Sequence, residues 1–337
     1  MNAYIRSLGA YAPEKVMTND DWTAYVDTSD DWIFTHTGIR ERRIAAPEQA
    51  ASDLGVQAAL DAFAKAERLS PEQRPISPAE IDLVICATAT PDYIGMPSTA
   101  CIIQDKLGIE NAGAMDISAV CSGFIYALDT AKSFVESGSA NNVLVVGTEV
   151  YSKIINWKDR STCVLFGDGA GAAVVSANDG SAGPSRIYKS RLAAKGSGAE
   201  HLLRATGGTR NPIPSGTVAT DETYVFMNGR QVYVFAVQAI IETIRTLLDK
   251  NEISFEDLDH VVPHHANRRI VEAACKRSGW PEERFFMNIE RFANTSAASI
   301  PIAMDEMLTR GLLKRGDKLM TVGFGAGLTF GGNYLVF

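Results

Sequence analysis

The sequence predicts an α/β fold in which one sheet-and-helix unit occurs twice. Strand-like and helix-like segments alternate along the chain, the strand-like segments are almost continuously apolar, and the second half repeats the plan of the first. Continuous apolar strands separated by helices are typical of sheets that are covered by helices on both faces. A repeated unit of this kind predicts two sheets packed around shared helices.

The first half contains four predicted strands and two predicted helices. The strands cover residues 81–90, 114–120, 142–150 and 163–175. The segment 98–107 has helical spacing, and a helix rich in small residues is predicted over 122–136. Strands that alternate with helices in this way indicate a mostly parallel sheet.

The second half repeats these elements at an offset of roughly 170–180 residues. The matching pairs of segments are 255–262 with 78–85, 284–290 with 112–118, and 317–327 with 141–150. The repetition predicts an N-terminal half, 1–176, and a C-terminal half, 177–337, that pack as one body. A stretch rich in Gly, Thr and Pro, 195–221, interrupts the pattern and is predicted to be a loop or flap.

Composition excludes several classes of protein. The 337 residues are 46% hydrophobic and 21% charged, as in ordinary globular proteins, and the net charge of −8 argues against a general nucleic-acid binder. The five cysteines are odd in number and form no CxxC pair, which predicts neither disulfides nor a zinc site and favours a reducing compartment. Neither a signal peptide nor a long uninterrupted apolar run is evident, so we expect a cytoplasmic protein without a membrane partner.

Three residues stand where chemistry is expected. Cys121 follows a predicted strand and opens a helix, Asn294 occupies nearly the same place in the second half, and His264 follows that half's first strand. Loops at the carboxyl ends of strands converge on one cleft in α/β folds. The positive end of a helix dipole favours a thiolate, and a thiolate suits attack on a thioester.

Each of these residues also has an ordinary structural interpretation. Cys121 alone could be a small core residue, His264 a hydrogen-bonded core histidine, and Asn294 the cap of the following helix. The adjacent His265 admits a two-histidine metal site, but no carboxylate or cysteine stands at ligand spacing nearby, which argues against a metal. The combination of all three residues favours catalysis.

Six segments carry a resemblance to a known family. They are VDTSDDWIFTHTGIRERR (26–43), MDISAVCSGF (115–124), FGDGAGAAVV (166–175), VPHHANRRI (262–270), ERFANTSAASIP (290–301) and GFGAGLTFGG (323–332). The sequence resembles the β-ketoacyl-acyl carrier protein synthase III family, the condensing enzymes that initiate bacterial fatty-acid synthesis. The resemblance runs almost end to end and implies a thiolase-like fold with five layers, α-β-α-β-α.

The resemblance implies a role for each of the three residues. Cys121 would be the nucleophile and acyl carrier, while His264 and Asn294 would hold the malonyl thioester carbonyl and stabilise the enolate formed on decarboxylation. The related elongating enzymes carry a second histidine where Asn294 stands. The backbone N–H groups of Cys121 and Ala326 would form the oxyanion hole. Many relatives have glycine in place of Ala326, and the backbone donor survives the change if φ stays negative.

The resemblance also implies a coenzyme A site. Trp32 and Arg160 would hold the adenine between an aromatic face and a guanidinium plane, and Thr28 and Asn267 would contact the nucleotide and the pantetheine arm. His36 stands where many relatives have an arginine for the phosphates. We therefore expect coenzyme A to be held more weakly or with more dependence on pH.

The helix expected after His264 is basic although the whole chain is acidic. One face carries Arg268, Arg269, Lys276 and Arg277. Such a face is usually only solvated, but beside an active-site entrance it could dock an acidic acyl carrier protein. We favour docking.

Met96 stands where relatives, often with phenylalanine, line the acyl pocket of the partner subunit. A flexible thioether leaves more room than a phenyl ring, which predicts a primer longer or bulkier than acetyl. The same resemblance implies a homodimer.

The leading hypothesis is decarboxylative condensation of acyl-CoA with malonyl-acyl carrier protein, which releases coenzyme A and carbon dioxide. Coenzyme A thioester is a substrate here, and no permanently bound cofactor is expected. One alternative is a diverged relative that makes a polyketide starter, an alkylquinolone-type ketone, or an ester or amide. Others are a silent subunit that only binds thioesters and, less favoured, a thiol redox protein, because no resolving cysteine lies near Cys121 in sequence.

Overall fold

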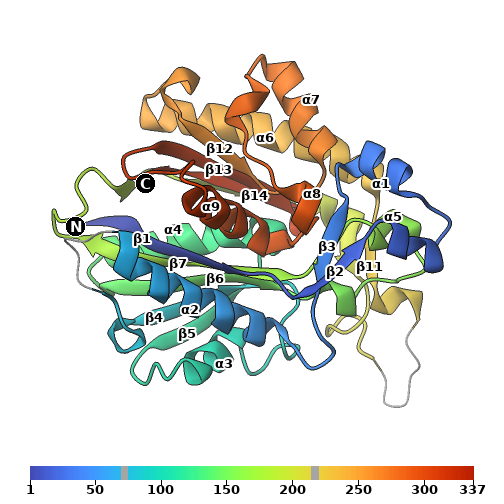
Figure 1. Ribbon diagram of the computed structural model, residues 1–337, viewed down its shortest axis with the longest axis horizontal. Coiled ribbons are helices and arrows are strands. Elements are labelled where there is room, and N and C mark those ends of the chain that lie inside the picture. The colour runs from blue at the N-terminus through green and yellow to red at the C-terminus, as the bar shows by residue number, and fades with distance from the viewer. Residues whose placement is uncertain (70–74, 214–219) are drawn as a thin grey trace.

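The computed structural model describes residues 1–69, 75–213 and 220–337. Two five-stranded sheets form its body (Figure 1). The first sheet has the order β1 (Asn2–Tyr11), β7 (Gly169–Asn178), β6 (Asn142–Glu149), β4 (Leu83–Ala87), β5 (Gly113–Ile117). The second has β12 (His260–Pro263), β13 (Lys318–Gly325) and β14 (Thr329–Val336), followed by β8 (Arg186–Ile187) and β9 (Arg191–Ala194), which both pair with β14.

The two sheets repeat one pairing pattern. In the first, β4 runs parallel to β6, while β6, β7 and β1 pair antiparallel in turn. In the second, β12 runs parallel to β13, while β13, β14 and the β8–β9 pair are antiparallel in turn. The internal duplication expected from the sequence is therefore confirmed in the strand pairing.

Helices form three layers around these sheets (Figure 1). The outer face of the first sheet is covered by α2 (Ala51–Leu69) and α3 (Thr99–Lys106), and that of the second by α6 (Gly229–Asn251) and α7 (Arg268–Ser278). Between the sheets lie α4 (Gly123–Glu136) and α9 (Ser299–Thr309), each in contact with both. The five-layered α-β-α-β-α arrangement is confirmed.

The middle layer is apolar nearly all round because it packs between two sheets. Phe124 and Leu128 of α4 and Ile300 and Met304 of α9 are fully or almost fully buried in one core. The starts of these two helices set the positions of the turns that precede them. Those turns carry Cys121 and Asn294.

The helix α6 is long and apolar enough to span a membrane by length and composition, the one such helix among the described residues. Its Ile240, Ile244 and Leu247 are instead buried in the core that α6 forms with β13, β14 and α7. Half of its most apolar window is buried, as expected of a core helix.

A group of short elements packs together at one end of the molecule (Figure 1). They are β2 (Lys15–Thr18), α1 (Asp30–Thr37), β3 (Glu41–Ile44), α5 (Arg160–Cys163), β10 (Leu202–Arg204), β11 (Val225–Met227) and α8 (Ile289–Phe292). Their core contains Trp22, Ile33, Tyr151 and Phe166. This group covers the end of the sheets at which the predicted site residues lie.

Most predicted elements are present with shorter bounds, but two predicted strands are partly wrong. Residues 163–168 are not a strand, since Asp159 caps α5 by accepting from the Ser161 N–H and β7 begins only at Gly169. In 284–290 only Phe285 bridges to Val261. Beyond it the chain turns into α8, where the Asn288 side chain is bound to Glu306 of α9.

The predicted loop 195–221 is partly ordered secondary structure. It holds a 3₁₀ helix at Gly196–His201 and the strand β10, which pairs antiparallel with β11. Residues 214–219 of this prediction lie outside the described residues. The β10–β11 ribbon covers one side of the cavity described next.

Candidate active site

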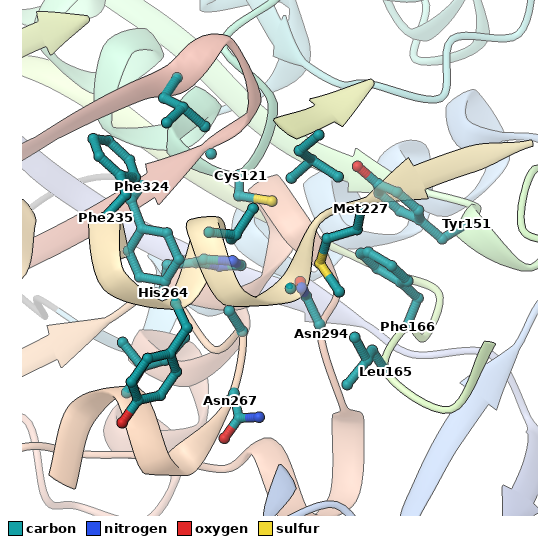
Figure 2. Close-up of a pocket in the computed structure, with 18 residues that line it drawn as sticks. Cys121, Tyr151, Leu165, Phe166, Met227, Phe235, His264, Asn267, Asn294 and Phe324 are labelled. Atoms are coloured by element: carbon teal, nitrogen blue, oxygen red, sulfur yellow. The ribbon is translucent and has the colours of Figure 1, made fainter. Parts of the chain in front are cut away.

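Cys121, His264 and Asn294 line one cavity of about 130 Å³ (Figure 2). They come from different elements and are brought together at the ends of β5, β12 and the turn before α9. The rest of the wall is mostly apolar and includes Tyr151, Leu165, Phe166, Leu202, Met227, Val232, Phe235, Phe324 and Leu328. A small cavity with a largely apolar wall strengthens the interactions of the few polar groups inside it.

Cys121 lies in a 3₁₀ turn, Val120–Ser122, directly before α4. The end of β13 approaches it closely, because a Cβ atom built on Gly325 would lie only 2.8 Å from the Cys121 backbone nitrogen. Ala326 follows, and it is not among the positive-φ residues of the described chain. The condition of a negative φ at Ala326 is therefore met, and Gly325, which precedes it, lies against the Cys121 backbone.

Burial favours the protonated form of the Cys121 thiol. Burial raises the pKa of Cys121 to about 12, although hydrogen bonding from Ser296 lowers it in part. The expectation that a helix N-terminus favours the thiolate stays a prediction, because desolvation of a charged sulfur acts against the dipole. A proton acceptor is needed when this thiol reacts.

His264 is not a fully hydrogen-bonded core histidine. Its Nδ1 lies 2.8 Å from Ser299 Oγ, but its buried Nε2 has no partner among the described residues. Burial, with the neighbouring His265, lowers the pKa of His264 to about 3, so the ring is neutral. An unpartnered buried nitrogen in a cavity wall is a group prepared for a ligand.

His265, rather than His264, is a hydrogen-bonded core histidine. Its Nε2 lies 3.3 Å from the Phe286 carbonyl oxygen, and burial lowers its pKa to about 4. Within the described ranges no three His, Cys, Asp or Glu residues cluster in a way that could hold a metal ion.

Asn294 caps a turn and lines the cavity at the same time. Its Oδ1 accepts the Ser296 N–H at 2.8 Å at the start of the 3₁₀ turn Ser296–Ala298. Its backbone binds Leu165 and Gly167 of the first half at 2.9 and 3.0 Å. With Oδ1 occupied by the cap, the amide Nδ2 group is the one left to donate toward the cavity.

Trp32, His36 and Arg160 form a surface cluster. The Arg160 guanidinium carbon lies 4.6 Å from the Trp32 ring centroid, and the His36 ring stacks on Trp32 at 4.5 Å. An inserted adenine needs about 7 Å, twice the usual carbon–carbon contact distance. Arg160, whose Nη1 donates to the Asp27 carbonyl at 2.7 Å, therefore has to move before a base can enter.

Asn267 connects this surface cluster to the cavity. It lines the cavity, its Oδ1 caps α7 by accepting the Arg269 N–H at 2.9 Å, and its Nδ2 donates to the His36 carbonyl at 3.0 Å. Thr28, the remaining predicted nucleotide contact, has a buried hydroxyl without a partner among the described residues. Asn267 thus touches both the cavity that holds Cys121 and the backbone of His36 in the surface cluster.

The four basic residues of α7 are exposed, but they do not form one uniform patch. Arg268 and Arg269 lie at the cavity end of the helix, and Arg268 pairs with Glu272 at 3.0 Å. Lys276 and Arg277 lie in the last turn, about 12 Å farther along the helix axis at 1.5 Å per residue.

Met96 does not reach the cavity of its own chain. It is 82% exposed, beside exposed Tyr93 and Ile94, in the loop between β4 and α3. The edge strand β5 lies next to this loop, since Met115 and Ala114 line the same surface groove as Ile94. An exposed apolar loop beside an unpaired strand edge is typical of a contact surface.

Sequence reasoning missed three polar residues near the site. Ser299 contacts His264, Glu149 ends β6, and Ser296 begins the turn after Asn294. Glu149 is the last residue of the apolar strand β6. His264 was selected because it follows a buried strand, and the same criterion applied to β6 could have indicated Glu149. Ser296 and Ser299 belong to the NTSAAS segment noticed only for Asn294.

Comparisons with known proteins agree with the resemblance. Residues 115–196 match the family model for 3-oxoacyl-[acyl-carrier-protein] synthase III, and 248–337 match the model of its C-terminal part. A beta-ketoacyl-[acyl-carrier-protein] synthase III from Caldanaerobacter subterraneus subsp. tengcongensis is 48% identical over 97% of this chain and 96% of its own length.

Solved structures are similarly close. The synthase III from Aquifex aeolicus VF5 has a TM-score of 0.88 and 44% identity, covering 99% of this chain and 100% of its own. That from Thermus thermophilus has a TM-score of 0.89 and 43% identity, covering 99% of each chain. With such identity over nearly its whole length, the chain belongs to the beta-ketoacyl-[acyl-carrier-protein] synthase III family of condensing acyltransferases.

Proposed function

We propose that this protein initiates fatty-acid synthesis by condensing an acyl-CoA primer with malonyl-acyl carrier protein. The products are 3-oxoacyl-acyl carrier protein, coenzyme A and carbon dioxide. The observation that carries the proposal is the meeting of Cys121, His264 and Asn294 in one apolar cavity, with the Nε2 of His264 unpartnered. The comparisons do not favour a diverged relative with a specialised product, because relatives named synthase III align along almost the entire chain.

In the first half-reaction Cys121 Sγ attacks the acyl thioester carbon and coenzyme A leaves. The negative carbonyl oxygen is held by the N–H groups of Cys121 and Ala326, a proposal supported by the close approach of the neighbouring Gly325 to the Cys121 nitrogen. The acyl chain then occupies the cavity as a thioester of Cys121.

In the second half-reaction the malonyl thioester carbonyl accepts hydrogen bonds from His264 Nε2–H and Asn294 Nδ2–H. Both groups are neutral donors at the oxygen that gains charge as carbon dioxide leaves. The resulting carbanion attacks the acyl-Cys121 carbonyl, forms the carbon–carbon bond and expels Cys121 as its thiolate, which takes up one proton from solvent to restore the thiol. Loss of carbon dioxide supplies the carbanion, so no strong base is required.

Coenzyme A thioester is bound as a substrate, without a permanently bound cofactor. We place the adenine between Trp32 and Arg160 after Arg160 swings aside, with Thr28 beside the nucleotide and the pantetheine arm passing Asn267. His36 stands near the phosphates. Trp32 stacks with Arg160 and His36, and the base would replace the contact with Arg160.

The carrier protein docks on the exposed basic residues of α7, with Arg269 nearest the cavity mouth. A second copy of the chain binds at the β5 edge and the Tyr93–Met96 loop, so that Met96 closes the partner's acyl pocket. Exposure of this apolar loop supports the dimer, and the thioether supports a primer longer than acetyl.

The chain consists of two repeated halves and acts in the cytoplasm. The halves 1–176 and 177–337 correspond to the two repeats, the first carrying Cys121 and the second His264 and Asn294. A cytoplasmic location is supported by five free cysteines, which suit a reducing compartment.

Intact-mass spectrometry tests the function directly. The protein is mixed with a panel of acyl-CoAs and then with malonyl-acyl carrier protein, beside a Cys121→Ser variant. We expect an acyl mass gain absent from the variant and its discharge as 3-oxoacyl carrier protein. Acylation that the carrier does not discharge would favour the specialised acyltransferase, and no acylation by any donor would leave a binding subunit.

A further inference from the structure

The two N–H groups assigned to the oxyanion hole come from different halves of the chain. Cys121 lies in the turn before α4, and Ala326 opens the 3₁₀ turn Ala326–Leu328 that joins β13 to β14. Two donors stabilise one developing charge only if both stay within hydrogen-bond distance of the same oxygen position. A displacement of about 1 Å can cost about 10²-fold in rate. Contacts between the two turns therefore have to fix their relative position.

The hydroxyl of Thr329 bridges these two turns. Thr329 is the first residue of β14 and pairs with Gly325 of β13, so it directly follows the turn that Ala326 opens. Its Oγ1 lies 3.0 Å from the Ala119 carbonyl oxygen and 3.1 Å from the Ala326 carbonyl oxygen. Ala119 leads into the turn of the nucleophile, so one side chain contacts the backbone on both sides of the oxyanion position.

The hydroxyl of Ser122 orients that of Thr329. The two oxygens lie 2.6 Å apart, a distance typical of a hydrogen bond between hydroxyls. Ser122 is 0% exposed, and its Oγ also lies 2.9 Å from the Ala119 carbonyl oxygen. Each hydroxyl has a single proton, so one donates to the other and the second donates onward to a carbonyl. The two side chains form one hydrogen-bonded pair that joins the first half of the chain to the second.

The backbone beside Cys121 needs support of this kind. Val120 has a φ of 47°, and a β-branched residue rarely adopts this left-handed conformation. Such a residue persists only where the surrounding structure holds it in place. The Ala119 carbonyl oxygen, which belongs to the peptide group before Val120, accepts the Ser122 N–H at 3.1 Å besides its hydroxyl contacts. Backbone and side-chain donors thus converge on the strained peptide that sets the direction of Cys121.

We propose that Thr329, oriented by Ser122, positions the oxyanion hole formed by Cys121 and Ala326. This inference rests on the proposed acyl transfer. Without the Thr329 hydroxyl, the turn that carries the Ala326 N–H loses its link to Ala119 and moves away from the carbonyl oxygen. The sulfur of Cys121 stays in place, because its own turn remains attached to α4. Ser122 and Thr329 are positioning residues, since they act through the two backbone donors.

A structural explanation of the same pair makes a different prediction. Two buried hydroxyls could merely satisfy each other, and replacing such a pair by apolar groups of the same shape can be nearly neutral. A general loosening of the turns would slow every reaction of the Cys121 sulfur. A misplaced oxyanion hole slows only those reactions in which a carbonyl oxygen gains negative charge.

Two reagents separate these explanations without coenzyme A or a carrier protein. The ester p-nitrophenyl acetate acylates Cys121: the Sγ–carbon bond forms, p-nitrophenolate leaves and the thiol proton passes to solvent. Its carbonyl oxygen carries negative charge on the way. Iodoacetamide alkylates the same sulfur at a saturated carbon, where no carbonyl oxygen gains charge. Both reactions need the thiolate, so the ratio of their rates reports the oxyanion hole and not the ionisation of the thiol.

The variants are Thr329→Val, Ser122→Ala, the double variant and Thr329→Ser, with Cys121→Ser as the blank for reaction at other groups. Valine keeps the shape of threonine and removes only the hydroxyl. Thr243→Val of α6 is the matched control, because its hydroxyl is also buried but has no partner among the described residues. Rates of both reactions at Cys121 are followed by mass spectrometry.

We expect Thr329→Val to lower the ratio of acylation to alkylation by about tenfold or more. Ser122→Ala should lower it less, since Thr329 can still donate to the Ala119 carbonyl. The double variant should resemble Thr329→Val, because Ser122 then has no partner hydroxyl to orient. Thr329→Ser should restore the ratio, and Thr243→Val should leave it unchanged. An unchanged ratio in Thr329→Val, or equal slowing of both reactions, would overturn the proposal.

Two further measurements keep other failures apart from this one. Melting temperatures identify a variant that does not fold. If Thr329→Val fails to fold, Ser122→Ala decides, with a lowered ratio in favour of the proposal and an unchanged ratio against it. Acylation of the wild type by acyl-CoA tests the proposed function separately, because the ester reports the oxyanion hole even in a protein that acyl-CoA does not acylate.

Discussion

The hydroxyl of Ser299 lies 2.8 Å from His264 Nδ1 and 2.9 Å from the Ser296 carbonyl oxygen. Its single proton can be donated to either acceptor. When it is donated to Nδ1, the neutral ring of His264 carries its proton on Nε2 and can donate into the cavity. Ser299 therefore controls which nitrogen of His264 faces the substrate as a donor.

Ser299→Ala should impair condensation selectively. Without the hydroxyl, Nδ1 has no donor to accept from, so the neutral ring can carry its proton on Nδ1 and leave Nε2 without one. We expect malonyl decarboxylation to fall about 10²-fold, as for loss of one oxyanion donor. Acylation of Cys121 by acyl-CoA, followed by mass spectrometry, should be preserved, and Ser299→Thr should restore condensation. Equal losses in both steps would contradict the tautomer argument.

Gly325→Ala should impair acylation. The new Cβ atom would lie 2.8 Å from the Cys121 nitrogen and displace one of the two N–H groups from the oxyanion position. We expect a fall of about 10²-fold in the acylation rate by stopped-flow measurement. Gly196→Ala is the control, since a Cβ atom there meets nothing within 4 Å. An active Gly325→Ala enzyme would show that this close approach is unimportant.

Trp32→Ala should weaken binding of the nucleotide without changing the chemistry. Stacking of a base on an aromatic ring contributes about 1–3 kcal/mol, so KM for acyl-CoA should rise about tenfold at constant kcat. An acyl-N-acetylcysteamine, which lacks the nucleotide, should react equally with both proteins. Steady-state kinetics with the two thioesters check this prediction. If the KM values for both thioesters rose in Trp32→Ala, Trp32 would not act through the nucleotide.

Charge reversal on α7 should separate the two substrates. Arg269→Glu/Lys276→Glu should reduce kcat/KM for malonyl-acyl carrier protein, with a marked dependence on salt, because opposite charges steer association. Loading from acyl-CoA should stay unchanged. Arg310→Glu, exposed on α9, is the control for charge alone. If the charge-reversed variant kept the wild-type kcat/KM for malonyl-acyl carrier protein, α7 would be excluded as the docking face.

Stability should fall in mild acid because of the two buried histidines. The pKa of His264 is lowered to about 3 and that of His265 to about 4, so below about pH 6.5 the unfolded chain binds protons that the folded chain does not. Glu149 opposes this effect, since its folded pKa of about 7 makes the folded chain bind a proton above about pH 4.5.

A His265→Asn variant isolates one of these protons. Its free energy of unfolding should lose about 2 kcal/mol less than that of the wild type between about pH 7 and pH 5, measured by urea denaturation. Identical slopes for the two proteins would mean that His265 titrates normally when folded.

Several features could be predicted from local sequence. Continuous apolar strands such as Leu83–Ala87 are buried on both faces whichever neighbours they have, and the repeated segments predict a second sheet of the same order. Residues just after such strands lie at one edge of the sheet, which is why Cys121 and His264 could be selected. The strand predicted at 284–290 failed because the Asn288–Glu306 hydrogen bond, which no local pattern reveals, draws the chain toward α9.

By itself the sequence determined the duplicated α/β plan, the family and the identities of Cys121, His264 and Asn294. Only the tertiary structure decided their chemical states, because a pKa or a tautomer depends on desolvation and on partners far away in the chain. Burial raises the pKa of the Cys121 thiol, Ser299 lies against one nitrogen of His264, and β6 packs closely on the turn before α9. These relationships exist only after both sheets have packed around α4 and α9, and the packing of β6 on the turn before α9 joins the two halves of the chain.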